Sequence, residues 1–202
     1  MTTFSALTLD EFLRQTSAKT PTPGGGAVAS AVGALSAALA QMVVSYSVGK
    51  KSLAEHEPRL KEAAAILERA RGLLMELAQE DAAAYGLVNE LQKLPEGDPR
   101  RAELPAANLA SVQVPLAVMA ACVDLLRLFV SLAGITNRAL RSDLGIAAVL
   151  AEATVRAGRW NVDVNLAFLG DEAEKKRAGE TAGTLVAEAV RLCAETEKAC
   201  GA

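Results

Sequence analysis

One aspartate falls within the apolar stripe of a long helix predicted between Pro58 and about Leu94. Asp81 follows Leu77 by four positions and therefore lies on the same face. A carboxylate on an inward face is costly unless it is paired or hydrogen-bonded, and Tyr85, one turn further on, is a candidate partner. Such a group can move protons or stabilise a cation, or it can be only a structural hydrogen-bond acceptor. The predicted stripe contains Ile66, Ala70, Leu73, Leu77, Ala84, Val88 and Leu91.

A glycine-rich loop leads directly into a second predicted helix. The sequence TPTPGGG runs from Thr20 to Gly26 and contains Pro23, Gly24 and Gly25. Free backbone N–H groups and the positive end of the helix dipole can bind an anion there, and glycines let a ligand approach closely. The spacing differs from that of a phosphate-binding GxxxxGKS/T loop, so a flexible turn is the alternative interpretation.

Two lysines follow the other end of that helix. Gly49 interrupts the helical pattern, and Lys50 and Lys51 come directly after it. Cations interact favourably with the negative, C-terminal end of a helix dipole. The lysines therefore have a structural explanation as well as an anion-binding one.

Further polar residues occur where later helices are expected to begin. Asn137, Ser142 and Asp143 suit turns and caps, and Asn161 suits the cap of a helix that it begins. Asn165 lies among apolar residues, where a buried amide needs a specific partner. The sequence thus leaves both a capping and a ligand-binding interpretation open for this group.

No pattern is typical of a metal centre or a disulfide framework. His56 is the only histidine, and we expect it to be solvated without a catalytic role. Cys122, Cys193 and Cys200 form no CxxC pair, so we expect reduced thiols and neither a metal nor a cofactor.

The composition predicts that helices position these residues. The chain has 202 residues, of which 51% are hydrophobic but only 3% aromatic. An interior of Ala, Leu and Val suits closely packed helices, whereas a β-protein would use more Thr, Tyr and Ile. We therefore expect one domain over residues 1–202, with an all-α fold that forms an antiparallel bundle of long, kinked helices and dimerises through helices.

Caps, glycines and prolines predict the helix boundaries. Pro105 and Pro115 are expected to break or kink the helix that contains them, and Gly158 is expected to end a helix just before Asn161 begins a short one. The predicted helices cover residues 9–17, 26–48, 58–94, 100–133, 142–158, a short stretch from 161, and 171–200.

The segment 26–48 has no charged residue and is long enough to cross a membrane. Its small residues recur every four positions, which favours a buried helix in close contact with its neighbours at a bundle centre or subunit interface. We expect no comparable second segment, because 112–134 carries Asp124 and Arg127. A membrane protein is thus the less favoured alternative.

The net charge of −3 excludes a broad basic surface, so we expect no nucleic-acid partner. The first residues lack the pattern of a secretory signal, so a cytoplasmic location is expected.

Helix lengths separate the polar residues into two clusters. The helix over 26–48 spans about 33 Å, which places the glycines and the lysines at opposite ends. The next helix, if antiparallel, rises about 35 Å before it reaches Asp81, which brings this residue level with the glycines. The same counting places Asn137 and Asp143 at the lysine end. An antiparallel dimer with its two-fold axis across the small-residue helix would join the clusters.

Together these motifs resemble the formiminotetrahydrofolate cyclodeaminase and methenyltetrahydrofolate cyclohydrolase family. The resemblance covers about Leu9 to Leu192, and Ser52 and Leu53 depart from the lysine and tyrosine that many members carry. It rests on TPTPGGGAVAS, VGKK, DAAAY, SDLGIA and NVDVNL, in this order.

The resemblance implies an all-helical homodimer that acts on a tetrahydrofolate derivative without a cofactor. The implied reaction cyclises 5-formiminotetrahydrofolate to 5,10-methenyltetrahydrofolate and releases ammonia. Hydrolysis of the methenyl compound to 10-formyltetrahydrofolate is the alternative, and a non-catalytic helical oligomer is a second alternative.

It also implies roles for single residues. Asp81 and Asp143 are candidates for acid and base, and Lys50 is a third catalytic candidate that, like Lys51, suits the glutamate carboxylates of the substrate. The implied substrate-binding residues are Pro23, Gly24, Gly25, Gly26, Lys51, Tyr85, Asn137, Ser142, Asn161 and Asn165.

Overall fold

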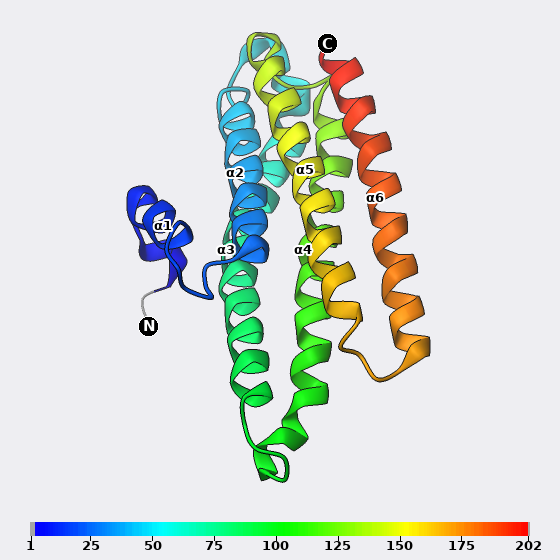
Figure 1. Ribbon diagram of the computed structural model, residues 1–202. Coiled ribbons are helices and arrows are strands. Elements are labelled where there is room, and N and C mark those ends of the chain that lie inside the picture. The colour runs from blue at the N-terminus through cyan, green and yellow to red at the C-terminus, as the bar shows by residue number, and fades with distance from the viewer. Residues whose placement is uncertain (1–2, 202) are drawn as a thin grey trace.

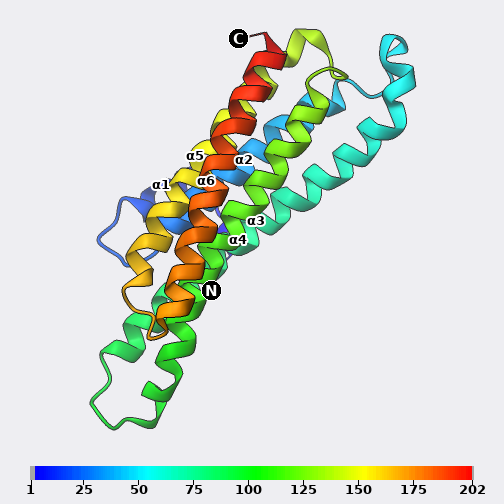
Figure 2. The same ribbon diagram turned by 90° about the vertical axis from the view of Figure 1, so that its right-hand side faces the viewer.

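The structure, a computed structural model, describes residues 3–201 and forms an antiparallel bundle of five long helices (Figures 1 and 2). No strand occurs among the described residues, so the predicted all-α bundle is confirmed. A short helix, α1 (Leu9–Thr16), lies outside the bundle in Figure 1. The bundle contains α2 (Gly25–Ser45), α3 (Glu57–Gln92), α4 (Leu104–Leu132), α5 (Arg141–Leu166) and α6 (Glu172–Cys200).

Short 3-10 segments lie before and between these helices. They are η1 (Phe4–Ala6), η2 (Lys51–His56), η3 (Pro99–Glu103) and η4 (Arg138–Leu140). The cap predicted for α1 is confirmed, because the Thr8 hydroxyl accepts a hydrogen bond from the Glu11 backbone N–H at 3.2 Å.

Small residues let α2 pack closely between α3 and α5. A Cβ atom on Gly33 would lie 2.9 Å from the Cys122 sulfur, so only a glycine fits this contact. Two buried hydroxyls also join the helices: Ser30 donates to the Leu74 carbonyl at 2.6 Å, and Ser36 donates to the Ala147 carbonyl at 2.7 Å. The close helix contacts predicted for this segment are thus present.

The inward face of α3 differs in part from the predicted stripe. Leu74 is fully buried, whereas the predicted Leu73 is 46% exposed. Two adjacent leucines fit the same helical period, and only packing against α2 and α4 selects one of them. The second half of the stripe is correct for Leu77, Val88 and Leu91, which are buried.

Prolines interrupt the helices less than expected. Pro105 lies in the first turn of α4, where a missing N–H costs nothing, and Pro115 lies inside α4 without ending it. A break at Pro115 is therefore wrong and a kink there stays a prediction, whereas Pro105 lies next to the change from η3 to α4 at Leu104.

The expected end of a helix at Gly158 is also wrong, because α5 continues through Gly158 and Asn161 to Leu166. A Cβ atom on Gly158 would lie 2.6 Å from Cγ of Met119 on α4. The glycine therefore permits close approach of two helices instead of ending one.

Two segments are long and apolar enough to span a membrane, α2 and the stretch Pro99–Leu132. The expectation that only the first would qualify is wrong, since the few charges of the second do not offset its apolar length. About half of each apolar window is buried inside the bundle, 56% and 50% respectively, as in core helices.

Candidate functional site

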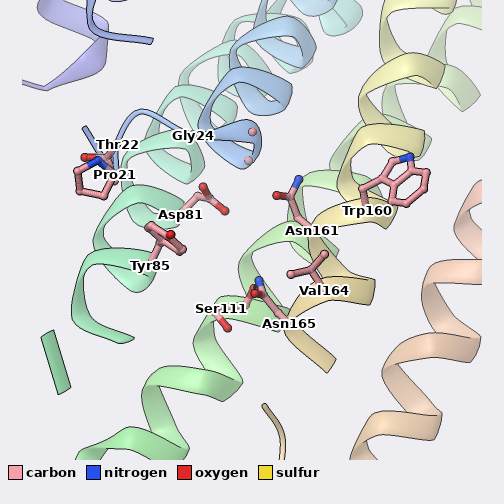
Figure 3. A pocket seen from close by; sticks show the side chains of 12 residues that line it. Pro21, Thr22, Gly24, Asp81, Tyr85, Ser111, Trp160, Asn161, Val164 and Asn165 are labelled. Atoms are coloured by element: carbon pink, nitrogen blue, oxygen red, sulfur yellow. Dashed lines mark hydrogen bonds between the residues drawn. The ribbon is translucent and has the colours of Figure 1, made fainter. Parts of the chain in front are cut away.

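The start of α2, the last third of α3, the first third of α4 and the last turns of α5 enclose a pocket of about 340 Å³ (Figure 3). Asp81 and Asn161 point toward one another across it, from α3 and α5 respectively. The pocket is lined by Pro21, Thr22, Gly24, Gly25, Gly26, Asp81, Tyr85, Ser111, Trp160, Asn161, Val164 and Asn165.

The Asp81 carboxyl group lies directly against the first turn of α2. A Cβ atom on Gly26 would overlap this carboxyl group, so the missing side chain makes room for it. Burial raises the pKa of Asp81, and the backbone N–H of Ala27 opposes this shift in part. A buried carboxyl group with a raised pKa at a helix N-terminus is a candidate for proton transfer.

Tyr85 is not the hydrogen-bond partner that the sequence suggested for Asp81. Its side chain is 47% exposed and lines the pocket, and no side chain of residues 3–201 donates a hydrogen bond to the Asp81 carboxyl group. The backbone at the start of α2 takes this place. Local spacing pointed to the next turn of the same helix, whereas the actual neighbour comes from another helix.

Two asparagines of α5 face the pocket with their amide nitrogens already bound. Asn161 Nδ2 donates to the Ala157 carbonyl at 3.1 Å, and Asn165 Nδ2 donates to the Ser111 carbonyl at 2.7 Å. Because a carbonyl can bind only the NH₂ end of each amide, the Oδ1 atoms remain as acceptors. A Cβ atom on Gly25 would lie 3.7 Å from Asn161 Oδ1, so this acceptor faces the glycines.

The glycines and both asparagines of the predicted set thus line one pocket with Asp81 and Tyr85, whereas Pro23 is buried and does not line it. Ser111 and Trp160 also line the pocket, although the sequence patterns did not predict them. Trp160 is 75% exposed beside Asn161, so its position next to a predicted residue was an available signal. The remaining missed lining residues are Pro21, Thr22 and Val164.

The other predicted residues lie at the opposite end of α2, as the helix lengths predicted. Lys50 and Lys51 are exposed, and Asp143 is half-buried in the first turn of α5. The 21 residues of α2 separate this end from the glycines by about 30 Å. One chain therefore does not bring these residues into the Asp81 pocket.

Asn137 and Ser142 complete this second group. The Asn137 backbone N–H donates to the Ser47 hydroxyl at 2.9 Å, and its Oδ1 accepts from the Ala139 N–H at 3.3 Å, which caps η4. Ser142 is exposed and lines a separate open cavity of about 430 Å³ between α5 and α6. The described part of the chain contains no cluster of three or more His, Cys, Asp and Glu side chains placed to hold a metal ion.

Residues 8–184 match the family described as formiminotransferase-cyclodeaminase. The chain belongs to this family. Its structure superposes on the crystal structure of formiminotetrahydrofolate cyclodeaminase from Thermotoga maritima with a TM-score of 0.90 and 33% identity, over 96% of each chain. The predicted family resemblance is confirmed.

Relatives within the formiminotransferase-cyclodeaminase family carry two different names. A methenyltetrahydrofolate cyclohydrolase of Methylorubrum extorquens is 35% identical over 92% of this chain and 91% of its own length. The formimidoyltransferase-cyclodeaminase of Sus scrofa is 31% identical over 90% of this chain, but the match covers only 34% of that longer protein. The chain thus corresponds to about a third of the bifunctional relative.

Proposed function

We propose that this chain is a folate one-carbon enzyme that cyclises 5-formiminotetrahydrofolate to 5,10-methenyltetrahydrofolate and releases ammonia. The observation that carries the proposal is the Asp81 carboxyl group, which lies in a pocket at the start of α2 opposite the Asn161 oxygen and has a raised pKa. A family member named cyclodeaminase shares the fold over nearly the whole chain. The second candidate is methenyltetrahydrofolate cyclohydrolase, the name of the bacterial relative from Methylorubrum extorquens.

In the cyclisation, N10 of the folate attacks the formimino carbon and forms a tetrahedral centre. N10 must lose a proton, and the amino nitrogen must gain one before the C–N bond breaks and ammonia leaves. One carboxyl group beside the tetrahedral carbon performs both transfers, and its ionised form stabilises the methenyl cation that results. In the hydrolytic reaction the same group takes a proton from the attacking water and delivers it to N5 as the ring opens, and the remaining hydroxyl proton goes to solvent as the formyl C=O forms.

The polar atoms of the α5 wall match the donors of a reduced pterin. Asn161 and Asn165 present Oδ1 acceptors, because their amide nitrogens are bound to backbone carbonyls. The pyrimidine ring of a tetrahydrofolate carries its 2-amino group and its N3–H donor side by side along one edge. We propose that these donors face the two asparagine oxygens and that the one-carbon bridge lies toward Asp81.

No lysine or arginine of residues 3–201 lines the pocket of one chain, where it could bind the glutamate carboxylates of a folate. Lys50 and Lys51 are exposed at the far end of α2. We propose a soluble, cytoplasmic homodimer in which these lysines and Asp143 of one subunit complete the Asp81 pocket of the other. Exposed apolar side chains on α2 and α5 support an interface there, namely Leu35, Ile146 and Val149 with exposed fractions of 58%, 52% and 44%.

The direct test offers the purified protein 5-formimino- and 5,10-methenyltetrahydrofolate separately. Cyclodeaminase activity releases ammonia and increases the methenyl absorbance, whereas cyclohydrolase activity decreases that absorbance without ammonia. If neither compound reacts and neither raises the melting temperature, the chain is not a folate enzyme, and a non-catalytic helical oligomer becomes the better interpretation.

Mixed dimers test the shared site. Asp81→Asn and Lys50→Ala homodimers are both expected to be nearly inactive, but a hybrid dimer contains one site that lacks neither residue. Random reassociation of equal amounts makes half of the dimers hybrids, so we expect recovery of about a quarter of the parental activity. Each variant reassociated with itself is the control. A mixture no more active than these controls would show that Asp81 and Lys50 do not act across a subunit interface.

A further inference from the structure

The middle of α4 contains a proline that faces the core. Pro115 is buried and lies inside the helix without ending it. Proline has no backbone N–H, so the carbonyl four residues earlier, that of Ser111, lacks its usual donor within the helix. A buried carbonyl without a donor is unfavourable, and another group is expected to bind it.

The group that binds this carbonyl belongs to the pocket. Asn165 Nδ2 on α5 donates to the Ser111 carbonyl at 2.7 Å. Asn161 Nδ2 donates at 3.1 Å to the Ala157 carbonyl, which lies inside an uninterrupted helix. The carbonyl freed by the proline thus makes the shorter of the two side-chain bonds.

We infer that Pro115 is a positioning residue for substrate binding, because it frees the Ser111 carbonyl to hold the Asn165 amide with its oxygen toward the pocket. The inference rests on the proposed function for the role of that oxygen. Pro115 acts without touching the substrate: it is absent from the pocket lining, whereas Ser111 and Asn165 both belong to it. With an N–H at position 115, the Ser111 carbonyl would accept within α4, and the Asn165 amide would lose its fixed orientation.

The test replaces Pro115 by valine, which restores the N–H with little change in volume, and by alanine. We expect the KM for the folate to rise about three- to tenfold, the range that corresponds to one hydrogen bond, with a smaller change in kcat. The side-chain amide resonances of Asn165 should shift in the NMR spectrum of the substrate-free protein. A helix without an internal proline should unfold at the same or a higher temperature.

Asn108 offers a matched control between α4 and the turn that follows α5. Its Nδ2 donates to the Phe168 carbonyl at 3.0 Å, but Asn108 does not line the pocket. Asn108→Leu removes this bond and should leave the KM and the Asn165 resonances unchanged. Asn165→Asp keeps the size of the side chain but removes the donor, and it should raise the KM as the proline variants do, even if those fold poorly.

A proline that serves only helix packing would give a different result. Unchanged KM and unchanged Asn165 resonances in Pro115→Val would overturn the inference, as would a parental KM in Asn165→Asp. The amide resonances need no substrate, so they decide the positioning separately: if the parent reacts with neither folate, the proposed function fails whatever the resonances show.

Discussion

Asp81→Asn is expected to lower kcat at least about 100-fold, the usual contribution of a group that transfers protons in the transition state. Asparagine fills the same space beside Gly26 but cannot take a proton from N10 or from water. The measurement is turnover of both folates, with Glu80→Gln, an exposed neutral substitution one residue earlier, as the matched control. If Asp81→Asn and Asp143→Asn both retain activity within a few-fold of the parent, the acid and base assignment is wrong.

The same variant should be at least as stable as the parent, in a manner that depends on pH. The pKa of Asp81 is raised in the folded state by burial, so the folded chain binds this proton more tightly than the unfolded chain. Below the unfolded pKa of about 3.9 the carboxyl group is neutral in both states and costs nothing. As the pH rises from the unfolded pKa to the folded pKa, the free energy of unfolding falls, and above the folded pKa it falls no further.

Asp81→Asn removes this loss, so its melting temperature should equal that of the parent in acid and exceed it at neutral pH. Thermal unfolding at a series of pH values measures the difference. The acid limb of kcat/KM for the parent should also lie above the pKa of an ordinary aspartate. A variant less stable than the parent at neutral pH would indicate that the charged carboxylate stabilises the fold.

The proximity of Asp81 to the glycines could be predicted from the sequence, because it depends on helix lengths alone. Two antiparallel helices joined by a short connection place residues at predictable heights, and 1.5 Å per residue is nearly invariant. The same arithmetic placed Asn137 and Asp143 at the lysine end. The capping of α1 by Thr8 was equally local and therefore predictable.

Contacts between side chains of different helices could not be predicted from helix lengths. Gly158 was expected to end a helix, but the close contact with Met119 on α4 requires a glycine there. Pro115 was expected to break or kink its helix, but α4 continues through it and Asn165 satisfies the carbonyl that the proline leaves free. In both cases a local signal for ending a helix has its explanation on another helix, which only the packed structure reveals. Ser111 was not predicted as a pocket residue, because its place there also depends on how the helices pack.

Gly26→Ala should disrupt the site by changing the α2 residue that the Asp81 carboxyl group contacts. An added Cβ would overlap the Asp81 carboxyl group, and neither helix can move freely, because Ser30 on α2 donates to the Leu74 carbonyl on α3 at 2.6 Å. The carboxyl group must therefore turn away or the helices must separate. We expect kcat to fall at least about tenfold and stability to fall by about 1–3 kcal/mol, as for other overpacked sites.

Gly25→Ala is the matched control, because its Cβ would lie 3.7 Å from Asn161 Oδ1, an ordinary contact. It should fold as stably as the parent and affect the KM more than kcat. A double-mutant cycle then isolates the cause. If the added methyl group destabilises the chain through the carboxyl group, Gly26→Ala should cost much less stability in an Asp81→Ala background than in the parent. Equal costs in both backgrounds would show that the glycine serves the backbone of α2 and not the placement of Asp81.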